Sequence, residues 1–185
     1  MKSGSRALGI AESYRDGDGT STLGGAVVAA DRTVDDFVFG RCTVGGLDST
    51  DAVADCWRRL DRPDVRYLLL AGVAPAWYNL LDPYALEGAI DRPVVVVSFE
   101  RSPGLEVPLR EAFDGEALDR RLERYRSLPE RRRITVDGRE LFVRSVGIDP
   151  DRVATVLDAY THGRRPEPLA VAKRAAAAAD AFRRD

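Results

Sequence analysis

Hydrophobic and polar positions in the first quarter of the chain predict three strands joined by short polar links. Apolar runs cover residues 6–14, residues 23–30 and a third segment that ends near Val44. The links between them are the Gly- and Asp-rich stretch 15–20 and the pair Asp31-Arg32, both of which favour turns. Because short links join neighbouring strands in opposite directions, we expect an antiparallel meander.

After residue 47 the pattern changes to helices that alternate with fully apolar strands. Residues 48–51 open a helix, with Asp48 or Thr50 as its N-cap. Residues 65–71 and 93–97 are continuous apolar runs, typical of strands buried on both faces. Between them, Asp82-Pro83 begins another helix, with Asp as cap and Pro at the first helical position. This alternation predicts parallel strands joined by right-handed crossovers.

The last third of the chain predicts helices around one hairpin. Two helices are expected over about 105–113 and 116–128, and the turn Asp137-Gly138 joins the hairpin strands within 133–143. Asp149-Pro150 begins a further helix, and an Ala-rich helix ends the chain. We expect the hairpin to extend one side of the domain and to pack with these two helices. No linker or repeat interrupts the pattern, so residues 1–185 are predicted to form one domain.

This order of elements resembles the ribonuclease H-like fold: an α/β domain with a mixed central sheet, flanking helices and an extra C-terminal hairpin. The resemblance implies that strand 6–14 lies beside strand 65–71 and parallel to it. Nucleases of that fold carry metal-binding acids at the ends of such strands, where a rigid strand aims them into a crevice. In this chain the corresponding positions are Ala11, Gly45 and Ala71.

Composition excludes several classes of protein. The 185 residues are 44% hydrophobic and 31% charged, as in soluble globular proteins. No apolar run approaches the ~20 residues of a membrane span, and the polar start is not a signal peptide, so we expect a cytoplasmic protein without membrane contact. Cys42 and Cys56 lack CxxC spacing and are predicted to be buried, reduced thiols. His162 is the single histidine, which excludes a Ser-His-Asp triad and a His-rich metal site.

Six sequence blocks resemble an archaeal, uncharacterised family, domain of unknown function 99. That family is similar to endonuclease V, which cuts strands near deaminated adenine and uses Mg²⁺. The blocks occur in the family's order and cover nearly the whole chain: residues 8–10, 44–50, 69–73, 78–82, 93–97 and 165–172.

The chain departs from this family pattern at its acidic positions. The family has an Asp pair where this chain has Ala11-Glu12, and single Asp residues where it has Gly45 and Ala71. In the terminal block, this chain has Ala170 and Lys173 at the positions where the family has Arg and His. Since Mg²⁺ is anchored by carboxylates and substrate phosphate, Ala and Gly leave it without protein ligands. The resemblance therefore implies a non-catalytic relative of endonuclease V, with no catalytic residue and no cofactor.

Three acids that remain leave an alternative open. Glu12 is either a remnant of a metal site or a solvated residue at the strand edge. Asp48 is either a remnant of the same site or a helix cap, and Asp82 is interpreted mainly as a helix cap. The alternative function is a Mg²⁺- or Mn²⁺-dependent endonuclease that acts on DNA or RNA with a rearranged site around these acids. It requires the Glu12 and Asp48 carboxylates to lie within about 5 Å of each other in an open cleft.

Charge patterning suggests one further site. The chain has 26 Arg but only 2 Lys, and its net charge of −2 argues against strong general attraction to nucleic acid. A local run of arginines over residues 120–133 is either a solvated face of i,i+4 ion pairs or a phosphate-binding surface. In the second interpretation Arg121, Arg124 and Arg132 contact phosphate, and nucleic acid is a weakly bound partner. The sequence does not predict an oligomeric state.

Overall fold

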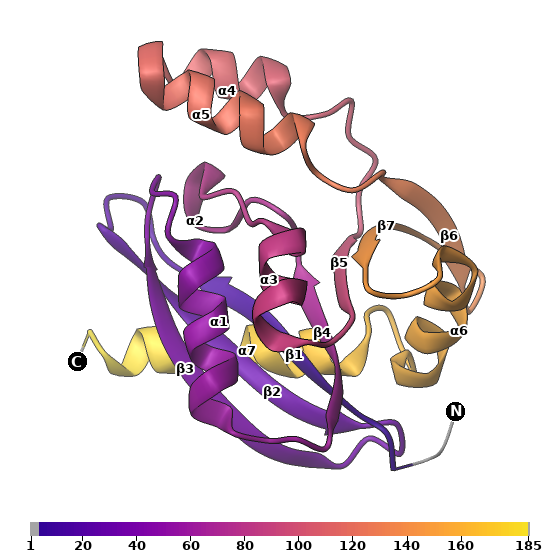
Figure 1. The fold of residues 1–185 in the computed structure, drawn as a ribbon. Coiled ribbons are helices and arrows are strands. Elements are labelled where there is room, and N and C mark those ends of the chain that lie inside the picture. The colour runs from indigo at the N-terminus through magenta and orange to yellow at the C-terminus, as the bar shows by residue number, and fades with distance from the viewer. Residues whose placement is uncertain (1–3, 185) are drawn as a thin grey trace.

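All strands that the computed structural model describes join one mixed sheet in the order β3-β2-β1-β4-β5-β7-β6 (Figure 1). The structure describes residues 4–184. β1, β4 and β5 run parallel to one another, and the remaining neighbours pair antiparallel. The predicted N-terminal meander and the parallel pairing of β1 with β4 are therefore confirmed. The strand bounds are β1 Arg6–Ser13, β2 Thr20–Ala29, β3 Val34–Thr43, β4 Val65–Ala71, β5 Val94–Ser98, β6 Arg132–Val136 and β7 Arg139–Val146.

Helices cover both faces of this sheet, and one helix pair lies away from it (Figure 1). The helices α1 and α3 cover one face, α6 and α7 cover the other, and α4 and α5 stand above the carboxyl ends of the parallel strands. None of the helices within residues 4–184 is long and apolar enough to cross a membrane. The helix bounds are α1 Ser49–Leu60, α3 Pro83–Ile90, α4 Glu106–Ala112, α5 Gly115–Arg126, α6 Pro150–Tyr160 and α7 Glu167–Phe182.

Small residues in β1 and β2 let α7 lie directly on the sheet. Side chains alternate along β1, so Leu8 and Ile10 face α1 while Gly9 faces α7. A Cβ at Gly9 would lie 2.3 Å from the Pro168 backbone, and one at Gly24 would lie 2.5 Å from the Ala176 amide nitrogen. These two glycines allow the closest approach of helix and strand.

The predicted hairpin forms around Asp137-Gly138. Both residues have positive φ, 48° and 70°, as a type I′ turn requires. β7 pairs with β5, so the hairpin continues the central sheet. As expected, α6 packs beside it, but α7 joins the same apolar cluster only through Leu169 near its start and otherwise crosses β1 and β2.

One turn that the sequence did not predict follows β4. The short segment α2, Pro75–Tyr78, contains Ala76, Trp77 and Tyr78 at φ values of 48°, 53° and 62°. A left-handed conformation costs a non-glycine residue roughly 1–2 kcal/mol. The Ala76 carbonyl accepts a hydrogen bond from the Gly45 amide at 2.7 Å, which ties this strained turn to the end of β3.

The two cysteines are confirmed as buried thiols that are not joined in a disulfide. Burial raises the pKa of the Cys42 thiol to about 12, and the nearby Asp48 and Glu12 carboxylates add to this effect. Cys42 is therefore protonated and unreactive at neutral pH.

Candidate functional site

The carboxyl ends of the three parallel strands meet beside a cavity of about 270 Å³. The register pairs Ile10 with Leu70 and Ala71 with Val97, which sets the ends of β1, β4 and β5 side by side. Ligands of open α/β sheets bind in such crevices. The cavity is lined by Ala11, Glu12, Ala71, Gly72, Val97, Ser98, Phe99, Glu100, Arg165 and Lys173.

The floor of this cavity, formed by Ala11 and Ala71 at the ends of β1 and β4, carries no side-chain ligand for a metal ion, although Glu12 and Glu100 also line the cavity. Ala11 is 4% exposed and packs against Ala26 and Ala172. Ala71 adjoins the same cluster from β4. The positions from which central strands would aim carboxylates into the crevice thus present methyl groups.

Two cations lie at the rim. Lys173 on α7 donates a hydrogen bond from Nζ to the Glu12 backbone oxygen at 2.6 Å. The Arg165 guanidinium lies over the Phe99 ring, 4.5 Å from its centroid. Both side chains are exposed; Arg165 lies just before α7, and Lys173 lies within its first two turns. Sequence reasoning had singled out Lys173 only as a departure from a family pattern and had not singled out Arg165.

Glu12 turns away from the floor. Because side chains alternate, it shares the α1 face with Ile10, and it lines a small gap there together with Leu23 and Val53. Its Oε2 accepts a hydrogen bond from Ser21 Oγ at 2.6 Å. This fits the expectation that Glu12 and the preceding strand-end residue point to opposite faces.

Asp48 is held within the turn between β3 and α1. It is the N-cap residue by position, but its carboxylate does not bond to the first amides of the helix. Instead it accepts hydrogen bonds from Thr43 N at 3.0 Å, Thr43 Oγ1 at 2.8 Å and Asn79 Nδ2 at 2.6 Å. Although burial opposes ionisation, these bonds lower the pKa of the Asp48 carboxyl. The expected side-chain cap is therefore wrong, and the carboxylate instead closes the turn.

Asn79 replaces Asp48 as the cap of α1. This fully buried amide accepts a hydrogen bond from Ser49 N at 2.9 Å through Oδ1 and donates to the Thr43 carbonyl at 2.8 Å. It thereby ties the start of α1 and the end of β3 to the loop after β4. These two partners of Asn79 lie thirty residues or more away along the chain.

Asp82 fulfils its predicted role as a helix cap. Its Oδ1 accepts hydrogen bonds from Tyr84 N and Ala85 N, both at 3.1 Å. Within residues 4–184, no group of three or more His, Cys, Asp or Glu side chains is placed to hold a metal ion. Glu12, Asp48 and Asp82, the three acids considered from the sequence, each accept hydrogen bonds from other residues of the chain and are not grouped around one ion site.

Arg121 lies in the interior, which removes it from the surface expected to contact phosphate. Its side chain is 4% exposed and donates to the backbone oxygens of Gly45, Gly46 and Ala117. The guanidinium also lies over the Phe113 ring, 3.8 Å from the centroid. The run of arginines gave no signal for this, because the Gly45 and Gly46 carbonyls lie some 75 residues away.

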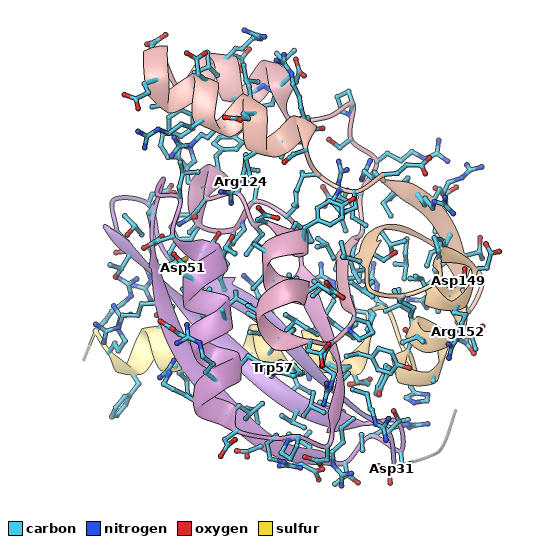
Figure 2. The ribbon with its side chains drawn as sticks, viewed as in Figure 1. Asp31, Asp51, Trp57, Arg124, Asp149 and Arg152 are labelled. Carbon is cyan, nitrogen blue, oxygen red and sulfur yellow. The ribbon has the colours of Figure 1, made fainter. Side chains whose placement is uncertain are left out.

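The other arginines of the run do not gather on one surface. Figure 2 shows Arg124 reaching from α5 toward α2, where its Nε lies 3.8 Å from Asp82 Oδ2. Arg132 pairs with Glu130 at 3.1 Å on the outer strand of the hairpin. Arg120 pairs with Glu116, the i,i+4 contact that the sequence predicted. Among the described residues of this run, two arginines lack a carboxylate partner: the buried Arg121, and Arg131, which is not buried in the interior.

Comparison with known proteins places this geometry in a family. The family model of endonuclease dU matches residues 3–180. The chain belongs to the endonuclease dU family. A UPF0215 protein of Pyrobaculum aerophilum is 35% identical over 178 residues, which cover 95% of this chain and 94% of that protein. The archaeal family resemblance expected from the sequence is thus confirmed.

Solved structures of similar fold include members of two groups. A protein of unknown function from Archaeoglobus fulgidus matches 95% of this chain and 98% of its own, with a TM-score of 0.83 and 25% identity. Endonuclease V of Ciona intestinalis, in complex with inosine-containing DNA, matches 97% of this chain and 86% of its own, with a TM-score of 0.63 and 10% identity. The expected endonuclease V-like fold is confirmed.

Proposed function

We propose that this chain is a non-cleaving member of the endonuclease dU family that binds nucleic-acid phosphates at the carboxyl ends of β1 and β4, without a metal ion. One observation carries the proposal. At the strand ends, where a metal-dependent site needs carboxylates, the cavity presents Ala11 and Ala71, and Lys173 and Arg165 line it as well. Two acids also line it, of which Glu12 accepts a hydrogen bond from Ser21 and Glu100 follows the end of β5.

The chemistry of the two kinds of site explains why this exchange matters. A divalent ion requires oxygen ligands and gathers negative side chains, whereas a phosphate requires N–H donors and positive charge. Lys173 is fixed at the strand end by its bond to the Glu12 carbonyl, so one cation stands at the end of β1 itself. It supplies charge neutralisation for a phosphate but cannot activate a water molecule as a bound metal ion does.

The choice of nucleic acid as partner rests on the fold. Endonuclease V of Ciona intestinalis, which has a similar fold, was solved in complex with DNA. The family name describes an endonuclease. The sequence resemblance implies acids at the positions where this chain has Ala11, Gly45 and Ala71. Retention of the apolar framework without those acids favours binding without cleavage.

Fluorescence anisotropy with a labelled oligonucleotide tests the location of binding. We expect weak, salt-sensitive binding, since few phosphate contacts are available. Lys173→Glu and Arg165→Glu should each weaken it by about fivefold or more and should each lower the slope of log affinity against log salt by about one.

Arg174 provides the matched control. It is the next residue on α7, is exposed, and does not line the cavity. Arg174→Glu makes the same charge change and should leave affinity close to the wild-type value. Equal losses in all three variants would mean that only net charge matters, and would contradict a site at the strand ends.

A further inference from the structure

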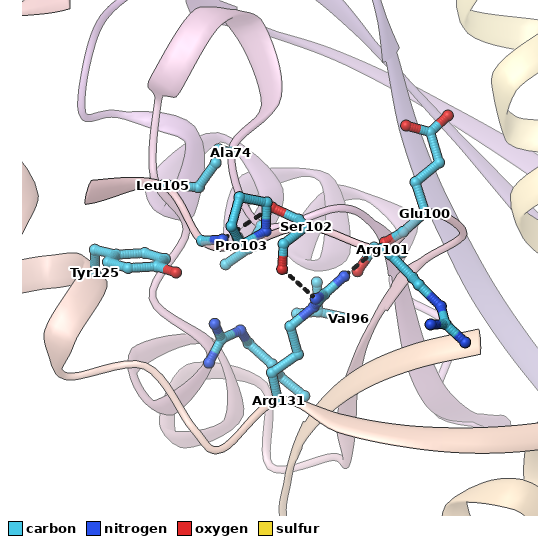
Figure 3. A pocket seen from close by; sticks show the side chains of 13 residues that line it. Ala74, Val96, Glu100, Arg101, Ser102, Pro103, Leu105, Tyr125 and Arg131 are labelled. Carbon is cyan, nitrogen blue, oxygen red and sulfur yellow. Dashed lines mark hydrogen bonds between the residues drawn. The ribbon is translucent and has the colours of Figure 1, made fainter. Parts of the chain in front are cut away.

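A second and larger cavity lies next to the strand-end site, between β5, α5 and β7. Its volume is about 660 Å³, and it shares Ser98 and Glu100 with the smaller cavity (Figure 3). One wall depends on Gly104, whose φ is +116° and where a Cβ would lie 2.9 Å from the Tyr125 hydroxyl. Tyr125 presents its ring to this cavity from α5.

Two half-buried arginines line the cavity and make their contacts with backbone carbonyls. Arg131 donates to the Glu100 oxygen at 2.7 Å and the Ser102 oxygen at 3.3 Å, and it lies 4.3 Å from the Phe142 ring centroid. Arg144, from the neighbouring strand, donates to the Pro129 oxygen. These contacts fix both guanidinium groups in place and leave further N–H donors on each of them.

Neither guanidinium has a carboxylate partner within residues 4–184. The third arginine at the cavity, Arg101, is different, because it pairs with Glu140 at 3.0 Å. Glu100 lines the cavity, but Figure 3 shows its carboxylate directed away from the Arg131 guanidinium. Burial lowers the pKa of Arg144; the neighbouring Tyr125 hydroxyl opposes this effect, and the nearby Arg131 charge adds to it. Two positive charges thus share one cavity without an anion from the protein.

We propose that this cavity binds a phosphate monoester, held by the guanidinium groups of Arg131 and Arg144. Two partly desolvated cations that face one space are stabilised by an anion between them, and guanidinium forks match phosphate oxygens bidentately. A volume of about 660 Å³ admits a mononucleotide-sized ligand. Tyr125 offers a ring against which a planar base would stack.

The phosphate monoester has two possible sources, a free mononucleotide or the 5′-terminal phosphate of a nucleic-acid strand. The site does not depend on the proposed function, because its cations are Arg131 and Arg144 whereas strand-end binding uses Lys173 and Arg165. Internal phosphodiesters, which carry a single negative charge, are weaker ligands for a pair of cations than a monoester.

Isothermal titration with inorganic phosphate, thymidine 5′-monophosphate and thymidine tests the site directly. We expect the two phosphates to bind and thymidine not to bind. Labelled thymidine 5′-monophosphate is then displaced with 5′-phosphorylated and 5′-hydroxyl forms of one oligonucleotide, followed by anisotropy. Stronger displacement by the phosphorylated form identifies a strand end as the source, and equal displacement by the two forms identifies a free nucleotide. Absence of binding by both phosphates would overturn the proposal.

Variants assign the binding to the two arginines. Arg144→Gln and Arg131→Gln should each weaken phosphate binding by about tenfold or more. Arg132→Gln, at an exposed neighbouring position outside the cavity, should leave it unchanged. Equal affinity in all three variants would contradict the assignment.

A measurement on the unaltered protein covers the case in which an arginine variant does not fold. Phenylglyoxal modifies accessible guanidinium groups, and the modified residues are identified by mass spectrometry. Thymidine 5′-monophosphate should protect Arg131 and Arg144 while Arg132 reacts as before. If the nucleotide changed the modification of neither Arg131 nor Arg144, the proposed site would be overturned.

Discussion

Asp48 illustrates how the partners of a single side chain decide between a structural and a metal-binding role. Its oxygens accept hydrogen bonds from Thr43 and Asn79 at 2.6 to 3.2 Å. A carboxylate kept for a metal ion has its oxygens open to solvent or to other ligands. Asp48 therefore stabilises the turn through bonds that need no ion.

Removal of this carboxylate should destabilise the protein in the absence of metal. Hydrogen bonds to a charged group contribute about 1.5–3 kcal/mol, so we expect Asp48→Ala to lower the free energy of unfolding by about 2 kcal/mol in urea with a chelator present. Asp51→Ala, at an exposed acid in the first turn of the same helix, is the control and should change it little. If Asp48→Ala were as stable as the wild type until Mn²⁺ was added, Asp48 would be a metal ligand.

The lowered pKa of Asp48 also gives the effect a pH dependence. A carboxyl whose pKa is lower in the folded state stabilises the protein above its unfolded pKa of about 3.9 and loses that contribution as pH falls through the folded value. The stability difference between the wild type and Asp48→Ala should therefore shrink on acidification below about pH 4. Urea titrations at several pH values measure it, and a difference that grew toward acid would contradict the assignment.

At the scale of elements, α5 depends on one buried arginine for its attachment to the sheet. Arg121 joins the helix to the carbonyls of Gly45 and Gly46 at the end of β3, and its Nε has no hydrogen-bond partner among the described residues. Burial alone lowers the pKa of this guanidinium. Elsewhere the α4–α5 pair rests on a small apolar cluster around Leu80, Leu109 and Leu122.

Arg121→Met should loosen this helix pair while leaving the sheet intact. It keeps a long apolar stem but removes the bonds to the β3 end. Amides of α4 and α5 should exchange with deuterium about tenfold faster or more, while those of β1 and β4 stay protected. Arg120→Met, on the exposed face of the same helix, is the control. Unchanged exchange in α4 and α5 would contradict the role of Arg121.

The same elements show what the sequence could predict and what it could not. The bounds of each strand and of the longer helices could be predicted to within a few residues. The signals used were the period of apolar positions and the Asp-Pro and Asp-Gly pairs, all of which are local. The left-handed turn at Ala76–Tyr78 has no such signal, since it contains no glycine. Burial of Arg121, the cation pair at Lys173 and Arg165, and the Arg131–Arg144 cavity depend on contacts between distant segments, which no periodicity encodes.

At the scale of the whole molecule, the docking of α7 on β1 and β2 positions the cations of the strand-end site. Gly24 permits this contact, because a Cβ there would lie 2.5 Å from the Ala176 backbone nitrogen and 2.8 Å from the Ala172 oxygen. Neither backbone atom can move without shifting the helix. The position of Lys173 is therefore coupled to the packing of small residues along the strands.

Gly24→Ala should consequently destabilise the protein and disturb the site together. Overpacking of a well-filled interior costs about 1–3 kcal/mol, which thermal unfolding would detect. Gly88→Ala, in α3 with no atom within 4 Å of the added Cβ, should instead be neutral or stabilising. Equal melting temperatures for wild type and Gly24→Ala would mean that α7 is less closely packed than described.

The most direct test of the central claim is cleavage itself. The measurement is the fraction of a labelled strand cut when the protein is incubated with oligonucleotides that contain deoxyuridine or inosine, with Mg²⁺ or Mn²⁺. We expect no cut above the level without protein, because Ala11 and Ala71 give the ion no ligand. Loss of the ion raises the activation barrier, and each increase of about 1.4 kcal/mol in the barrier slows cleavage tenfold. Metal-dependent cleavage by the unaltered protein that is lost in Glu12→Gln or Asp48→Asn would contradict the claim and establish a rearranged nuclease site.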